Sequence, residues 1–411
     1  MKLPKAVKRA LKLLEEAGYE AVVVGGAVRD YLLGKTPNDY DISTNARPEE
    51  VKEVFKNFHT LDIGIKHGTV TVFIDRRQLE ITTYRSERDY EGFRHPKEVV
   101  FETDLDADLG RRDFTVNAIC YNRRIIDKVG GIADLQAKLI RAIGDPSVRF
   151  REDPLRILRA LRFAAVLNFR IESGTRDAIF KEKELLRKVS SERINLEFSK
   201  LLLGETAPEI IEEYAAVLRV FLPELPEELA LNLKALPKLD GLASRLASLL
   251  VGAEPGVAEG TLKRLKYPKN KISQVLFLLA NKDREIKPEL SEIGKFLKDF
   301  ESADLLCLLG FQKAFLEAEG RSHNLDEVLK LAKQIDPGKC YRLKDLAVSG
   351  RDLLAMGYPE GAGIRILLDK LLDLVIEGRL KNEKEELLGY LEKNNPPAGK
   401  CMIVNDLRPN K

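Results

Sequence analysis

The stretch that decides the fold spans residues 22–42 and reads VVVGGAVRDYLLGKTPNDYDI. Its apolar start is typical of a short buried strand, which Gly25 and Gly26 end. Helical spacing follows, and a turn rich in Pro and Asn leads into a second strand at Tyr40. The stretch therefore predicts a strand, a helix and a second strand within one small unit that mixes both kinds of structure.

Similar patterns continue along the first third of the chain. Residues 4–18 and 48–55 have the apolar periodicity of amphipathic helices. Residues 69–74 and 79–84 are rich in β-branched residues around a charged turn, which predicts a hairpin. Residues 86–110 are polar and have no steady period, so we predict a long mobile loop that carries a partial strand.

The character of the sequence changes after about residue 145, where strand patterns vanish and apolar residues recur at helical spacing. We therefore predict an α+β N-terminal head, with a small mixed sheet and helices, followed by an all-α remainder. Its expected parts are a head at 1–143, a helical neck at 144–205, a helical body at 206–330 and a helical tail at 331–411.

Composition excludes several classes of protein. The 411 residues are 44% hydrophobic and 32% charged, which is typical of a globular protein with a substantial core. No apolar run is long enough for a membrane span and no signal-peptide pattern is present, so a cytoplasmic location is expected. The net charge of only +3 means that any nucleic-acid contact must come from local basic patches.

Asp39 and Asp41 are the first candidates for chemistry. Residues two apart on a strand point to the same side, so these carboxylates would lie together at a strand end. Repulsion makes it unfavourable for both carboxylates to be charged unless a cation lies between them. Mg²⁺ prefers oxygen ligands and would suit this position. Glu80, a polar residue within an apolar alternation, is a candidate third carboxylate. Alternatively, Asp39 and Asp41 belong to an ordinary surface turn, and Glu80 lies on the solvent face of an edge strand.

Gly25 and Gly26 would let backbone amides approach phosphates where a strand passes into a helix. Arg111 and Arg112 would suit phosphate contacts, and Asp113 can accept a hydrogen bond from a sugar hydroxyl. The alternative interpretation of the arginines is a charged loop before a strand.

The segment REDPLRILRALRF at residues 151–163 repeats arginine at every third position from Arg156. Asp153 and Arg156 can act side by side, whereas Arg162 points well away and needs another partner. An acceptor beside a donor matches an amino group beside a ring nitrogen, the edge that cytosine and adenine share and that guanine and uracil reverse. This pair would accept CTP and ATP without a template. Alternatively, Asp153 only caps the helix that follows Pro154.

With these segments in this order, the chain resembles the class II tRNA nucleotidyltransferase and poly(A) polymerase family from about Val22 to Leu203, and more weakly beyond. The resemblance implies a nucleotidyltransferase head and catalysis by a two-metal mechanism with Mg²⁺. It implies metal ligation by Asp39 and Asp41, with Glu80 at the position of a third catalytic carboxylate. The nucleotide-contacting positions that it implies are Gly25, Gly26, Arg29, Arg112, Asp113, Glu152, Asp153, Arg156, Arg159 and Arg162.

Within the family the sequence is most like the bacterial CCA-adding enzymes. Ser349-Gly350-Arg351-Asp352-Leu353 and the glycines that follow are similar to their tail pattern. The expected substrates are CTP, ATP and the tRNA 3′ acceptor end, and the sequence indicates no obligate protein partner. The length of the 86–110 segment disfavours enzymes that add only the two cytidines. An enzyme that adds only adenosine, a poly(A) polymerase and a catalytically silent RNA-binding protein stay open as alternatives.

Overall fold

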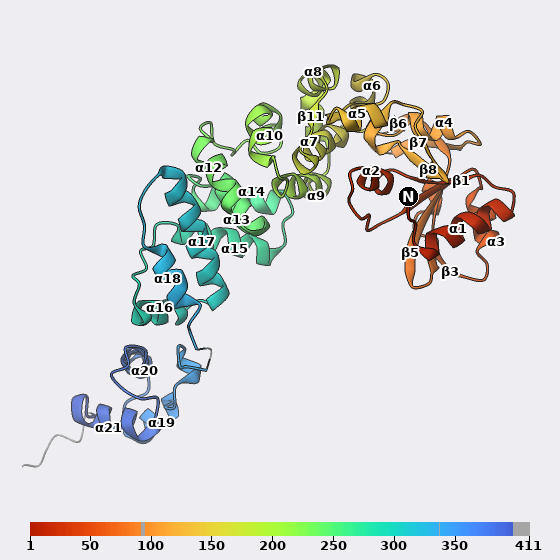
Figure 1. The fold of residues 1–411 in the computed structure, drawn as a ribbon. Helices are drawn as coiled ribbons and strands as arrows, with labels where there is room; N and C mark the ends of the chain where they lie inside the picture. The colour runs from red at the N-terminus through yellow and green to blue at the C-terminus, as the bar shows by residue number, and fades with distance from the viewer. Residues whose placement is uncertain (92–94, 337, 398–411) are drawn as a thin grey trace, which may run out of the picture. The chain divides into compact units, whose positions relative to one another are not determined.

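The computed structural model describes residues 1–91, 95–336 and 338–397, with the side chains outside 87–99. The chain divides into two compact units. The first unit comprises residues 1–233 and 241–273, and the second comprises residues 234–240 and the chain from 274 onward. Figure 1 shows the sheet and its helices in the N-terminal part, and helices in the rest of the chain. The predicted fold class, an α+β head followed by a helical remainder, is confirmed.

A seven-stranded mixed sheet forms the centre of the head, in the order β3-β4-β5-β2-β1-β8-β9. Its strands are β1 (Ala21–Val24), β2 (Asp41–Thr44), β3 (His59–Leu61), β4 (Thr69–Ile74), β5 (Arg77–Thr83), β8 (Cys120–Asn122) and β9 (Arg124–Ile126). Strand β2 pairs antiparallel with β1 but parallel with β5. This places Asp41, the first residue of β2, opposite Glu80 of β5.

The described part of the head has five α-helices, of which the first three lie in the segments with predicted helical spacing, whereas the sequence patterns do not predict the last two. The five helices are α1 (Lys5–Glu16), α2 (Gly26–Leu32), α3 (Pro48–Val54), α4 (Leu105–Gly110) and α5 (Gly131–Gln136). Helix α1 buries Val7, Leu11 and Leu14 at helical spacing, and it packs against β1 and α3. The predicted hairpin is β4 and β5. Its turn residues Asp75 and Arg76 have φ of 49° and 63°, the left-handed conformation that tight hairpin turns require.

The prediction of a long mobile loop at 86–110 is wrong for the described residues. The segment forms an antiparallel hairpin, β6 (Arg85–Glu91) and β7 (His95–Phe101), before helix α4. Backbone pairing of the two strands supplies hydrogen bonds that a polar sequence without apolar alternation does not reveal. Asp104 then caps α4 by accepting a hydrogen bond from Asp106 N at 3.1 Å. Residues 92–94 lie outside the described part.

The rest of the first unit is almost entirely helical. The exception is β10 (Leu139–Ile140), which pairs in parallel with β11 (Arg170–Ile171). The helices are α6 (Pro146–Glu152), α7 (Leu155–Leu167), α8 (Ser173–Glu182), α9 (Ser191–Leu202), α10 (Ala207–Glu213), α11 (Ala215–Leu218), α12 (Ala230–Ala235), α13 (Gly241–Leu249), α14 (Pro255–Arg264) and α15 (Lys269–Asn281). Helices α12 and α15 both continue into the second unit.

The second unit is helical throughout its described part. Its remaining helices are α16 (Leu290–Leu297), α17 (Ser302–Glu319), α18 (Leu325–Ala332), α19 (Gly350–Ala355), α20 (Ala362–Ile376) and α21 (Lys384–Asn394). Leu353, Leu371 and Leu387 are fully buried in one apolar cluster that joins α19, α20 and α21. Within the described ranges, no helix combines the length and the apolar character needed to span a membrane.

Candidate active site

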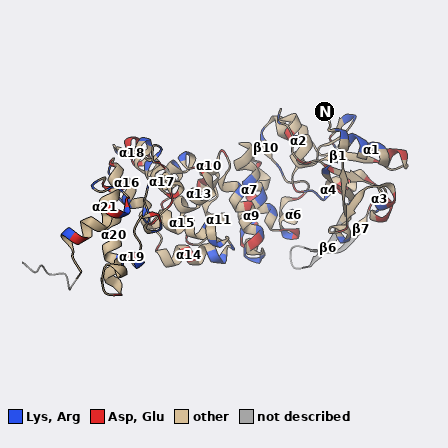
Figure 2. Ribbon diagram, turned by 90° about the horizontal axis from the view of Figure 1, so that it is seen from below, with Lys and Arg blue, Asp and Glu red and all other residues tan. Residues whose placement is uncertain are grey.

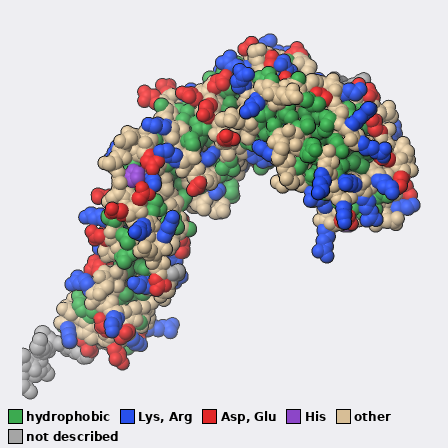
Figure 3. Space-filling model, viewed as in Figure 1, with side chains coloured by type: hydrophobic (Ala, Val, Ile, Leu, Met, Phe, Trp, Pro, Cys, Tyr) green, Lys and Arg blue, Asp and Glu red, His purple; other side chains and the backbone are tan. Residues whose placement is uncertain are grey.

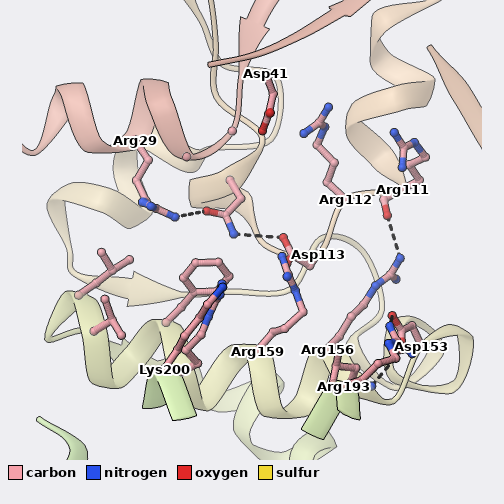
Figure 4. A pocket seen from close by; sticks show the side chains of 18 of the residues that line it. Arg29, Asp41, Arg111, Arg112, Asp113, Asp153, Arg156, Arg159, Arg193 and Lys200 are labelled. Atoms are coloured by element: carbon pink, nitrogen blue, oxygen red, sulfur yellow. Dashed lines mark hydrogen bonds and ion pairs between the residues drawn. The ribbon is translucent and has the colours of Figure 1, made fainter. Parts of the chain in front are cut away.

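A cavity of about 930 Å³ in the first unit collects most of the predicted site residues (Figure 4). Eight arginines and one lysine line it, against three aspartates, so it suits a polyanion. Of the expected residues, the cavity is lined by Gly25, Gly26, Arg29, Asp41, Arg112, Asp113, Asp153, Arg156, Arg159 and Arg162. Asp39, Glu80 and Glu152 are not among its lining residues.

The candidate catalytic carboxylates lie around the start of β2. Asp41 begins the strand, Glu80 faces it in register on β5, and Asp39 lies just before the strand. Loss of hydration at the Asp41 carboxyl group raises its pKa, and the negative charge of Glu80 raises it further. Arg112 opposes this rise, and Asp39 adds to it. Arg112 therefore only partly balances the negative charges near Asp41. A bound cation would reduce the repulsion between the Asp41 carboxylate and those of Glu80 and Asp39.

The protein alone does not form a closed metal site in its described part. No group of three or more His, Cys, Asp or Glu side chains there could hold a metal ion. Open sites of this kind suit a hard cation that keeps water and phosphate oxygens among its ligands. Asp39 and Asp41 are candidate ligands for such an ion, whose other ligands would be water and phosphate oxygens.

Gly25 and Arg29 belong to the turn from β1 into α2. Gly25 has φ of 79°, and a Cβ there would lie 3.6 Å from the carbonyl oxygen of Asn117 and 3.7 Å from Arg112 Nη1. The positive φ favours glycine here, whereas both Cβ distances are ordinary contacts. Arg29 is buried and donates a hydrogen bond from Nη1 to Asn117 Oδ1 at 2.6 Å.

Asp108, a fully buried residue of α4, positions two arginines. Its Oδ1 accepts from Arg111 Nη2 at 2.7 Å, and its Oδ2 accepts from Arg112 Nη2 at 2.9 Å. Burial alone would raise the pKa of Asp108, but Arg112 and Arg111 hold it below its usual value. Arg112 Nη2 also donates to Ser43 Oγ of β2 at 3.0 Å, which ties it to the strand that carries Asp41.

Asp113 is held by a full set of donors. Its Oδ1 accepts from Phe114 N and Asn117 Nδ2, and its Oδ2 accepts from Arg159 Nε at 2.8 Å and Nη2 at 2.5 Å. Burial would raise the pKa of Asp113, and the Arg159 charge and these hydrogen bonds lower it. A sugar hydroxyl that binds Asp113 therefore has to replace one of these donors.

The candidate base-recognition pair lies where α6 ends and α7 begins. Asp153 accepts a hydrogen bond at Oδ1 from Leu155 N at 3.1 Å, so it does cap the helix. Its Oδ2 accepts from Arg193 Nη2 at 2.7 Å, and its side chain also lines the cavity. Arg156 donates to Glu152 Oε2 at 2.7 Å and to the carbonyl of Arg111 at 3.1 Å. Asp153 can therefore cap the helix and line the cavity at the same time.

Arg162 has the separate partner that its spacing predicts, Glu197 of α9, with Nε 3.0 Å from Oε2. It does not point out of the site, however, because the cavity extends along α7 and Arg162 lines it together with Arg156. Phe163 lies among three guanidinium groups: the carbons of Arg162, Arg29 and Arg159 are 3.9, 5.3 and 5.4 Å from its ring centroid. Burial, followed by repulsion from Arg159 and Arg29, outweighs Glu197 and lowers the pKa of Arg162.

Some residues of the cavity are not marked by the sequence pattern. Arg193 lies near the start of α9, and its contribution to the site appears only through its bond to Asp153. Phe163 reads as an ordinary core residue that follows Arg162. Arg85 and Lys200 carry no motif, and only the fold brings them to this cavity.

Known proteins are similar to the chain in sequence and in fold. A model described as "Poly A polymerase head domain" matches residues 21–141. A second, described as "Probable RNA and SrmB- binding site of polymerase A", matches residues 168–229, and a third, described as "tRNA nucleotidyltransferase domain 2 putative", matches residues 244–391. The CCA-adding enzyme of Listeria innocua is 38% identical over 393 residues, 93% of this chain and 97% of that protein. The enzyme of Lactobacillus helveticus is 36% identical over 95% of this chain and 98% of its own length.

The chain belongs to the CCA-adding enzyme family.

Solved structures of family members agree with this assignment. The crystal structure of the Bacillus stearothermophilus CCA-adding enzyme in complex with CTP matches with a TM-score of 0.84 at 31% identity, over 96% of this chain and 98% of that one. The Thermotoga maritima CCA-adding enzyme complexed with tRNA shares the fold, with a TM-score of 0.65 at 23% identity over 95% of this chain and 96% of that one.

Proposed function

We propose that this chain adds C, C and A to the 3′ end of tRNA, using CTP and ATP without a nucleic-acid template and releasing pyrophosphate. The observation that carries the proposal is the presence of Asp153 and Arg156 in the same cavity as Asp41. One part of this cavity can recognise a base, and another can serve the transfer of a nucleotide.

Base selection rests on the order of donor and acceptor. Asp153 accepts from the amino group of cytosine or adenine, and Arg156 donates to the adjacent ring nitrogen. Guanine and uracil present a carbonyl and an N–H in the reverse order, so each would face a like group. Glu152 and the carbonyl of Arg111 hold the Arg156 guanidinium, which limits its freedom to adapt to the wrong base.

Phosphate binding rests on the arginines of the cavity. Arg29, Arg159 and Arg162 surround Phe163, and their combined charge suits the triphosphate. Nucleotidyltransferases generally depend on a divalent metal, and we propose that the ion is Mg²⁺, held by Asp39 and Asp41 with Glu80 beside them. When bound, it would favour the charge that develops on the α-phosphate during in-line attack by the RNA 3′-hydroxyl.

The helical remainder would hold the acceptor end of tRNA by its shape and its phosphates. Figure 2 shows lysine and arginine positions along the helices of both units. We retain the division into a head at 1–143, a neck at 144–205, a body at 206–330 and a tail at 331–411 as part of the proposal. We also propose a cytoplasmic location, which a fluorescent fusion of the chain would test.

The test is the product sequence on a tRNA that lacks CCA, with all four nucleoside triphosphates present. The expected product ends in CCA, with no incorporation of G or U. Long adenosine tails would indicate a poly(A) polymerase, and incorporation of A without any use of CTP would indicate an A-adding enzyme. No incorporation by the folded protein would favour a silent RNA-binding protein.

A further inference from the structure

Phe163 is an apolar residue in the most basic part of the cavity. Its ring lies among the guanidinium groups of three arginines, with the central carbon of Arg162 at 3.9 Å from the ring centroid. Those of Arg29 and Arg159 are at 5.3 and 5.4 Å. The face of an aromatic ring carries partial negative charge and attracts cations within about 6 Å. All three arginines are therefore within reach of this attraction, and Arg162 is in direct contact.

The ring of Phe163 is itself held in place by the head. Only 8% of the residue is exposed. Its ring packs edge to face against that of Phe114, which is fully buried, with centroids 5.9 Å apart and an interplanar angle of 79°. Edge-to-face packing is a preferred geometry of aromatic pairs. Phe114 directly follows Asp113, so the segment that supplies this carboxylate also orients the Phe163 ring.

Two of the three arginines are also held by hydrogen bonds. Arg29 donates to Asn117 Oδ1 at 2.6 Å and to Asp30 Oδ1 at 2.8 Å. Arg159 donates to Asp113 Oδ2 from Nε and Nη2. Asn117 Nδ2 also donates to Asp113 Oδ1 at 3.2 Å, so one chain of hydrogen bonds joins the two arginines. Figure 4 shows Arg29 and Arg159 at its two ends. Both guanidinium groups therefore have fixed partners besides the ring.

Arg162 differs, because no hydrogen bond to the described part of the chain holds it. Its Nε lies 3.0 Å from Glu197 Oε2, but both atoms are buried without a hydrogen-bond partner there, so the pair is held by charge alone. Consecutive side chains of a helix point about 100° apart. Arg162 therefore has to bend back to place its guanidinium over the ring of Phe163. The closest ring contact thus belongs to the arginine that lacks hydrogen bonds.

We infer that Phe163 is a positioning residue, which holds the Arg162 guanidinium ready to bind the triphosphate of the incoming nucleotide. This inference rests on the proposed function. The nitrogen nearest Glu197 is Nε, so the two Nη groups of Arg162 remain available. Guanidinium groups bind phosphate oxygens through pairs of N–H groups of this kind. An arginine that is already in place loses less conformational entropy when the triphosphate binds.

An aromatic ring suits this task better than a second carboxylate. The ring attracts the guanidinium through its face, whereas phosphate oxygens accept hydrogen bonds from the N–H groups at the edge of the guanidinium. Both interactions can therefore exist together. A carboxylate in the place of the ring would also hold Arg162, but its negative charge would repel the triphosphate. Phe163 carries no formal charge and leaves the charge of the arginine to the ligand.

The experiment replaces Phe163 in the full chain by 4-fluorophenylalanine and by pentafluorophenylalanine. Both nearly keep the shape of the ring, while fluorine weakens and then reverses the partial charge of its face. The probe is inorganic tripolyphosphate, titrated by calorimetry without divalent ions so that no metal contributes. The Kd should rise about twofold with the single fluorine and about fivefold with five. Phe163→Leu, which lacks the ring, should resemble the pentafluoro variant.

A double-mutant cycle assigns the effect to Arg162. In an Arg162→Ala background, pentafluorophenylalanine at position 163 should change the Kd by less than about twofold, because the nearest cation is gone. Figure 3 shows basic side chains at many places on the visible surface, so tripolyphosphate can also contact the protein elsewhere. Pentafluorophenylalanine in place of Phe180 is therefore the matched control. Arg176 lies 5.2 Å from that ring, neither residue lines the cavity, and the Kd should not change.

Kinetics separate positioning of the arginine from general destabilisation. The KM values for CTP and ATP should rise by similar factors, because both nucleotides carry the triphosphate, whereas the Kd for an RNA minihelix should stay within about twofold. An unchanged or lower Kd for tripolyphosphate in fluorinated variants that melt like the wild type would overturn the inference. The same holds for an equal loss in the Arg162→Ala background, and for a wild type that does not bind tripolyphosphate. A wild type that binds tripolyphosphate but incorporates no nucleotide would instead refute the proposed function, and the calorimetric comparison would still decide the inference.

Discussion

Arg193 Nη2 donates a 2.7 Å hydrogen bond to Asp153 Oδ2, across 40 residues of sequence. The other oxygen of Asp153 accepts from Leu155 N at 3.1 Å. The carboxylate is thus held from α9 on one side and from the start of α7 on the other. A group that must present a fixed acceptor to a base needs such support.

Arg193→Ala should therefore weaken base selection without removing the carboxylate. We expect discrimination against UTP and GTP, measured as the ratio of kcat/KM values, to fall about tenfold because Asp153 loses its orientation. The KM for tRNA should change little. Arg193→Lys keeps the charge and should recover part of the selectivity. Equal selectivity of wild type and Arg193→Ala would mean that the cap at Leu155 suffices.

Asp153→Ala tests the pair itself. Loss of the acceptor should reduce discrimination against GTP and UTP by about 10²-fold, while triphosphate binding, which depends on the arginines, changes less. Competition experiments with all four nucleotides would measure this discrimination. Unchanged discrimination, accompanied by a lower melting temperature, would reduce Asp153 to a helix cap.

Asp108→Asn should disorder two arginines at once. Asp108 is fully buried and pairs with Arg111 and Arg112, so its replacement should destabilise the first unit by about 3 kcal/mol at neutral pH. It should also raise the KM for nucleotide, because Arg112 lines the cavity. Asp106→Asn, which replaces an exposed aspartate of the same helix, is a suitable control.

The stabilising effect of Asp108 should depend on pH in a defined direction. Its pKa is lowered in the folded state, so its contribution is complete above the unfolded value, about 3.9, and is lost as the pH falls through the folded value. The difference in unfolding free energy between wild type and Asp108→Asn should therefore be constant from pH 8 to pH 5. A difference that already shrinks between pH 7 and pH 6 would contradict this assignment.

Local patterns predict the fold where they coincide with burial. The strand at Val22, the glycine turn and the hairpin around Asp75 all follow from spacing and turn chemistry, and each is present. The hairpin of β6 and β7 does not, because its stability comes from backbone pairing between segments that have no apolar alternation. The site shows a similar limit. Asp153 can be found from its sequence motif, but its contact with Arg193 depends on the packing of α7 against α9.

Asp41→Asn should separate activity from stability. Asp41 faces Glu80 in register and lies two residues after Asp39, so the neutral amide removes repulsion among three carboxylates. We expect incorporation of CMP to fall by about 10³-fold or more, because the candidate metal pair loses one charge. The melting temperature without divalent ions should rise slightly, by about 1–2 °C. Added Mg²⁺ should stabilise the wild type but not the variant, since a ligand stabilises only the state that binds it. Calorimetry with and without Mg²⁺ would measure both effects, and equal stabilisation of the two proteins by the ion would place the metal elsewhere.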